Sequence, residues 1–131
     1  MNDATDEEGK AAKEEVDEQD PMPDVQTVAS GDFIARSHPT VGTATVITDG
    51  TQTFLRLEGF ETDNGPDLNV YLATGDPEGA SVDFVDLGDL KGNIADQKYE
   101  IPADVDPSTY TTVYIWCVRF GVAFGAASLG P

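Results

Sequence analysis

Short runs of alternating apolar and polar residues fill the chain from about residue 31 to residue 129. Gly, Asp, Asn and Pro separate these runs, which are rich in Val, Ile, Thr, Phe and Tyr. A period of two is typical of strands with one buried face, and turn residues between such strands indicate hairpins. The pattern therefore predicts an all-β domain, an antiparallel β-sandwich or barrel of about eight strands.

The clearest unit is a hairpin over residues 43–57, where Asp49-Gly50 separates two β-prone runs. Further strands are expected over residues 32–36, 68–73, 82–87, 98–101, 111–118 and 122–129, with a loop or a single helical turn over residues 88–97. The run 111–118 is the most apolar, which predicts a central strand covered on both faces. Alternation places Cys117 on one face with Val113 and Ile115.

The beginning of the chain has a different composition. Residues 1–24 carry ten acidic residues against Lys10 and Lys13, and they contain no aromatic residue. Such a segment cannot bury enough apolar surface to offset the entropy lost on ordering. We therefore expect a disordered acidic tail or stalk over residues 1–29, followed by one β domain over residues 30–131.

The net charge of −18 limits the partners of this protein. Residues 1–24 contribute −8 and the remainder −10, so the β domain is itself acidic. A polyanion repels phosphate backbones, and we expect no nucleic-acid partner. No window is apolar enough to span a bilayer. Met1 is followed at once by polar and acidic residues rather than by a signal peptide, so we expect any export signal or lipid anchor to lie upstream.

Two residues are candidates for chemistry. Cys117 is the single cysteine, so these residues contain no disulfide pair. It is either a small inert core residue or a thiolate that binds a metal ion or haem, or that cycles through oxidised states. His38 is the single histidine and precedes Pro39 in an expected loop. It is either a solvated surface group or a cofactor ligand near Cys117. Haem bound by Cys117 would need a second ligand, and His38 and Met22 are the two neutral candidates.

A functional thiol needs a nearby group that stabilises its charged form. Arg119 shares the face of Cys117 only if the strand continues for two more residues. Otherwise the group comes from another loop, with His38 as the leading candidate. We therefore predict that His38 lies on the rim of the domain near Cys117.

The acidic segment over residues 61–67 is a candidate for cation binding. Asp63, Asn64 and Asp67 offer the oxygen ligands that calcium prefers, although their spacing does not match an EF-hand loop. Asp and Asn also dominate ordinary turns, because their side chains bond the nearby backbone. Both interpretations stay open. Neither zinc-ligand spacing nor a phosphate-binding glycine loop is present.

Several motifs follow one another in a characteristic order. They are Gly31-Asp32-Phe33, His38-Pro39-Thr40 with Gly42, Asn64-Gly65-Pro66-Asp67-Leu68, Val70-Tyr71-Leu72, Asp86-Leu87-Gly88, Lys98-Tyr99, Ile101-Pro102 and Val113-Tyr114-Ile115-Trp116-Cys117. This order resembles the DM-thirteen domain family, also called the electron transfer DM-thirteen family. The resemblance covers nearly all of residues 30–129, and the acidic tail lies outside it.

The resemblance implies an extracytoplasmic β domain, secreted or lipid-anchored. We do not expect a stand-alone enzyme. It also implies a redox or electron-transfer role centred on a cysteine, which falls at Cys117, and a redox partner protein. Haem or a metal ion is then the candidate cofactor. The alternative is a non-catalytic extracytoplasmic binding or adhesion module, in which Cys117 is packing and the acidic loops hold calcium.

Overall fold

The computed structural model describes residues 25–75 and 83–131, and this part of the chain contains strands and no helix. The strands are β2 (Gln26–Ala35), β3 (Thr40–Thr48), β4 (Thr53–Thr62), β5 (Leu68–Ala73), β6 (Phe84–Asp89), β7 (Gln97–Ile101), β8 (Thr112–Cys117) and β9 (Val122–Ser128). The prediction of an all-β domain of about eight strands is confirmed. Within the described residues, nothing helical is long and apolar enough to cross a membrane.

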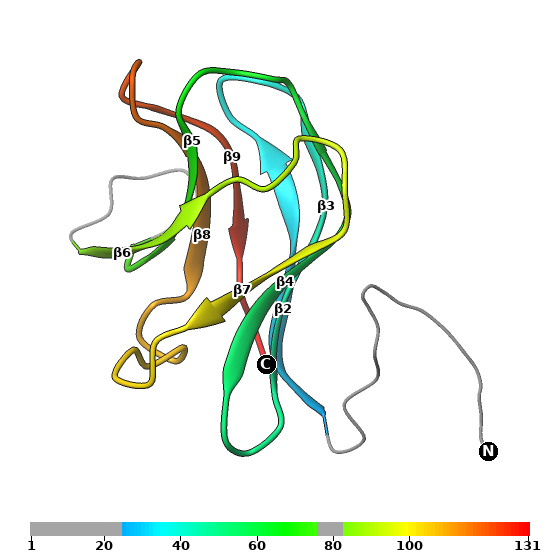
Figure 1. Cartoon of the computed structure of the whole chain (residues 1–131), viewed down its shortest axis with the longest axis vertical. Coiled ribbons are helices and arrows are strands. Elements are labelled where there is room, and N and C mark those ends of the chain that lie inside the picture. Colours follow the sequence, from blue (N-terminus) through cyan, green and yellow to red (C-terminus); the bar gives the residue numbers. More distant parts are fainter. Residues whose placement is uncertain (1–24, 76–82) are drawn as a thin grey trace.

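The strands form one antiparallel sheet in the order β6-β5-β8-β9-β2-β3-β4-β7. Strand β2 makes the corner of this sheet, because residues 26–32 pair with β3 and residues 33–35 pair with β9. The sheet folds over so that its edge strands, β6 and β7, come into contact. Figure 1 shows both edge strands in front of the rest of the sheet. The result is a nearly closed barrel, with the character of a two-layer sandwich.

Several element boundaries differ from the expected ones. Strand β2 begins at Gln26, ahead of the expected domain start at residue 30, because Gln26 and Thr27 pair with the end of β3. Of the loop and the single helical turn considered for residues 88–97, the structure has a loop after β6, in which Ile94 forms an isolated bridge with Glu61. Residues 1–24, which include most of the expected tail, lie outside the described residues.

The core fills the space between the two halves of the sheet. Its largest fully buried side chains include Phe60, Phe124, Leu55, Leu57, Leu72, Ile115, Val46, Val70 and Val113. The alternation predicted for the most apolar strand is confirmed, since Val113, Ile115 and Cys117 of β8 all belong to this core. Tyr114 of the same strand belongs to a second buried cluster, on the opposite face of the sheet.

The loop over residues 90–96, which connects the two edge strands, is held by side chains of β7. The buried side chain of Gln97 accepts hydrogen bonds from the backbone N–H groups of Lys91 and Gly92, at 3.1 and 3.2 Å, and its amide donates to the carbonyl oxygen of Gly92 at 2.8 Å. The hydroxyl of Tyr99 accepts a further bond from the Lys91 N–H at 2.8 Å. Two buried side chains of β7 thus fix residues 91 and 92, which form one wall of a hollow described below.

Candidate functional site

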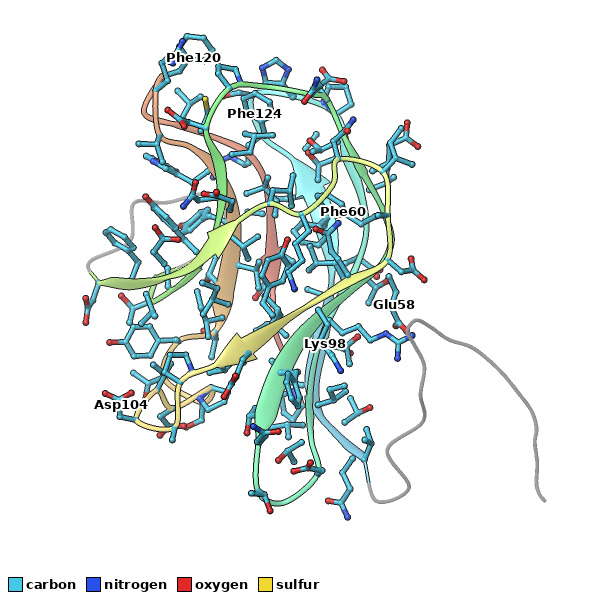
Figure 2. All side chains as sticks on the ribbon, viewed as in Figure 1. Glu58, Phe60, Lys98, Asp104, Phe120 and Phe124 are labelled. Carbon is cyan, nitrogen blue, oxygen red and sulfur yellow. The ribbon has the colours of Figure 1, made fainter. Side chains whose placement is uncertain are left out.

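Three connections meet at the end of the barrel where β8 stops. They join β2 to β3 (residues 36–39), β4 to β5 (residues 63–67) and β8 to β9 (residues 118–121). All three lie at the top of Figure 1. In Figure 2 Phe120 and Phe124 mark the same end, whereas Asp104 lies at the opposite end.

Cys117 is the last residue of β8 and points into the core at this end. Its side chain is 0% exposed. The thiol donates a hydrogen bond to the carbonyl oxygen of Pro66 at 3.1 Å, across the connection between β4 and β5. The backbone carbonyl of Cys117 accepts a bond from the N–H of Gly121 at 2.9 Å, which closes the turn into β9. The thiol is therefore buried directly beneath a short loop.

The sequence explains the shape of that loop. Proline fixes φ and forces Gly65, the residue before it, toward an extended conformation. Asp67 has a φ of +55°, a left-handed conformation that Asp tolerates better than most residues. A proline followed by a residue of positive φ favours a tight turn, and this turn aims the Pro66 carbonyl at the thiol. The N–H of Val118 donates to the carbonyl of Asp67 at 3.0 Å and fixes the turn to β8.

His38 lies at the same end and contacts the same loop. Its Nδ1 and the Oδ2 of Asp63 are 2.9 Å apart, in a pair whose side chains are 39% and 54% exposed. The imidazole also packs on the ring of Phe124, with centroids 3.8 Å apart and an angle of 31° between the ring planes. The structure thus brings His38 to the Cys117 end, through Phe124 and Asp63 rather than through a contact with sulfur. Its cofactor-binding role stays a prediction.

Arg119 does not share the face of Cys117. Strand β8 ends at Cys117, because the turn to β9 begins with the bond from Gly121. Arg119 therefore lies in that turn and is exposed. The strand extension that would put Arg119 on the face of Cys117 is therefore absent, and stabilisation of the charged thiol by His38 stays a prediction.

The connection that carries His38 is held by a buried hydroxyl network, which sequence reasoning missed. The Oγ1 atoms of Thr40 and Thr62 are 2.9 Å apart, and Thr40 also donates to the carbonyls of His38 and Phe124, each at 3.2 Å. The backbone N–H of His38 donates to the carbonyl of Phe124 at 3.2 Å. Threonines at the ends of strands are too common for these two to be singled out from the sequence alone. Only the pairing of Thr40 with Thr62 shows the network.

The three candidate calcium ligands separate in the structure. Asp63 pairs with His38, whereas Asn64 and Asp67 line a hollow of about 390 Å³. Across the described part of the chain, no three His, Cys, Asp or Glu side chains gather in a way that could hold a metal ion. The calcium site stays a prediction, without support from the positions of these side chains.

The hollow lies between the loop over Cys117 and the loop over residues 90–96, with the end of β6. Asn64, Gly65 and Asp67 line one side, and Asp89, Lys91 and Asn93 line the other. Cys117 does not line it. The loop over the thiol is therefore packed against Phe124 but open toward this hollow.

With this geometry in view, comparison with known proteins identifies the family. Residues 32–129 match the family described as Electron transfer DM13. The chain belongs to the Electron transfer DM13 family. Neither a curated protein nor a solved structure matches it.

The match confirms the resemblance inferred from the order of motifs. It spans β3 to β9 and the last four residues of β2, and it includes Cys117, His38 and the whole loop over the thiol. The family description indicates a redox-related role for this DM13 domain and is compatible with a redox partner. It names no residue, so the assignment of that role to Cys117 is taken up below as a proposal.

Proposed function

We propose that this DM13 domain is an extracytoplasmic electron-transfer accessory whose redox group is the Cys117 thiol. The observation that carries the proposal is the position of that thiol. It belongs to the core, but it lies at the end of a strand, beneath a loop whose Pro66 carbonyl accepts its hydrogen bond at 3.1 Å. In this proposal an oxidant reaches the thiol by movement of that one loop.

One cysteine determines which redox chemistry the domain can perform alone. An intrachain disulfide cycle needs two thiols, and these residues supply one. Hydrogen peroxide can transfer one oxygen atom to the thiol, which gives a sulfenic acid and water. Two external thiols then reduce the sulfenic acid back to the thiol, and they leave as their disulfide with a second water. Two electrons thus pass from external thiols to peroxide through Cys117.

A second function, a non-catalytic binding or adhesion module, is favoured by a specific observation. Cys117 is 0% exposed, as a cysteine that serves only for packing would be. The turn beside it presents exposed apolar side chains, with Val118 48% and Phe120 61% exposed. Exposed apolar groups gathered at one end of a domain are typical of a contact with another protein.

Protein purified from its native host distinguishes these functions. A visible absorption band that disappears in Cys117→Ala, or oxidation of the thiol in native buffer, supports the redox function. A colourless protein whose thiol reacts only after unfolding contradicts it and supports the binding module. Cell fractionation of the same host tests the location, because recovery of the protein in the cytoplasm contradicts an extracytoplasmic role.

A further inference from the structure

We infer that residues 63–66 form a lid over the Cys117 thiol, which opens locally, and that His38 and Phe124 are the positioning residues that hold it closed. The biological meaning of the lid rests on the proposed redox role of Cys117. Its existence does not, because access to a thiol can be measured whether or not the thiol is oxidised in the cell.

The lid is bounded by two firmly held residues. On one side, Thr62 is buried, donates its N–H to the carbonyl of Asn93 at 2.9 Å, and shares the hydroxyl contact with Thr40. On the other side, the carbonyl of Asp67 accepts the bond from Val118. The positive φ of Asp67 makes this residue a natural pivot, because relaxation of its backbone moves the preceding residues. Movement is therefore confined to the short segment between these anchors.

The lid is held at three of its residues, by one exposed contact and two buried ones. Asp63 is held by the imidazole of His38, in a pair that is largely exposed to solvent. Gly65 lies against the ring of Phe124, so closely that a Cβ there would be 2.7 Å from the Phe124 Cζ atom. Pro66 accepts the bond from the thiol. None of these contacts is a backbone ladder bond between strands, so all of them can break while the barrel stays folded.

The ring of Phe124 contacts both His38 and the lid. Phe124 is 1% exposed, with its ring in contact with His38 and close to Gly65. Loss of the imidazole therefore removes the partner of Asp63 and also uncovers part of the Phe124 ring. The other side of the lid borders the hollow of about 390 Å³, which gives residues 63–66 space to move into. The lid is thus held by His38 and Phe124 on one side and borders open space on the other.

The experiment is native-state labelling of the thiol with a maleimide, followed by intact mass, over a series of low urea concentrations. Any label reports Cys117, because it is the single cysteine. Local opening of the lid exposes little surface, so the labelling rate should not change with urea below the unfolding transition. Labelling through global unfolding rises with urea as steeply as the unfolding equilibrium does.

Two variants weaken the contact between His38 and Asp63 without altering the thiol. Asp63→Asn weakens an exposed pair and should speed labelling about two- to fivefold. His38→Ala also removes the ring contact and should speed it about tenfold. The matched control is Glu58→Gln, which weakens the comparably exposed pair of Glu58 with Arg56, 3.1 Å apart. Figure 2 places Glu58 well away from Phe124, so labelling should stay at the wild-type rate.

The inference is overturned if wild-type labelling follows the urea dependence of global unfolding. It is equally overturned if Glu58→Gln speeds labelling as much as Asp63→Asn does. Asp63 is exposed, so its variant should fold even if His38→Ala does not. A lid that opens over a thiol without redox activity refutes only the proposed function. Redox activity that His38 and Asp63 do not influence refutes only the lid.

Discussion

Replacement of Gly65 by alanine tests whether the lid is packed against Phe124. A Cβ at Gly65 would lie 2.7 Å from Cζ and 2.8 Å from Cε2 of the Phe124 ring, closer than real contacts allow. The ring is 1% exposed and carries His38 on its surface, so it has little freedom to move away. The backbone of Gly65 is not in the left-handed region, and the steric contact is thus the main cost of the substitution.

The size of the effect follows from two opposing terms. Overpacking of a well-packed site costs about 1–3 kcal/mol. Replacement of glycine by alanine at an unstrained position raises the free energy of unfolding by about 0.4–1 kcal/mol, because it lowers the conformational entropy of the unfolded chain. Gly65→Ala should therefore lower the free energy of unfolding by about 1.3 kcal/mol, the difference of the two midpoints, and by at most about 2.6 kcal/mol. It should also speed labelling of Cys117, because the added methyl group pushes the lid away from the ring.

Urea denaturation followed by the fluorescence of Trp116, the single tryptophan, measures this free energy. Gly92→Ala is the matched control, since a Cβ there meets only the Cβ of Ala95 at 3.4 Å. Its free energy of unfolding should stay within about 0.5 kcal/mol of wild type or rise slightly. In a Phe124→Leu background, Gly65→Ala should cost at least about 0.5 kcal/mol less. A Gly65→Ala protein as stable as the Gly92→Ala control, or strict additivity with Phe124→Leu, would refute the packing of the lid.

Three further predictions concern the barrel. Leu57→Ala, at a side chain that is 0% exposed, should lower the free energy of unfolding by about 2–5 kcal/mol, measured by urea denaturation. Thr40→Val leaves the hydroxyl of Thr62 with one partner fewer and should cost about 1–3 kcal/mol in the same assay, so an unchanged midpoint would rule out the hydroxyl network. Burial raises the pKa of Tyr99 from its ordinary value of 10.0 to about 12. The folded state then keeps a proton that the unfolded state loses between these values, so the contribution of Tyr99 to the free energy of unfolding should be constant below pH 10.0 and fall as the pH rises to about 12. Tyr99→Phe should remove this part of the alkaline loss in a pH series of urea denaturations.

The strands could be predicted because each has a strong local pattern. The alternation over β8 identified the core face of Cys117, and the Asp49-Gly50 pair located the turn between β3 and β4. In that turn Gly50 alone has a positive φ, and the carboxylate of Asp49 instead accepts the N–H groups of Thr51 and Gln52. The start of β2 could not be predicted, since it depends on the length of β3, its partner.

The site depends on contacts between distant parts of the chain, which no local pattern contains. His38 meets Phe124 because the sheet order places β9 beside β2. A lone histidine before a proline carries no sign of that neighbour, and Phe124 reads as an ordinary core residue. The Asn-Gly-Pro-Asp run predicted a turn, but the bond from Cys117 to the Pro66 carbonyl follows only from the pairing of β5 with β8.

The central claim, that Cys117 is a redox group reached through the end of the barrel, is tested most directly by trapping its oxidised form. Native protein is treated with hydrogen peroxide and dimedone, which traps sulfenic acid and not methionine sulfoxide, and its intact mass is followed in time. We predict one dimedone adduct, absent in Cys117→Ser, that forms in native buffer faster than the barrel unfolds. A thiol that stays unmodified until the protein is unfolded would contradict the claim.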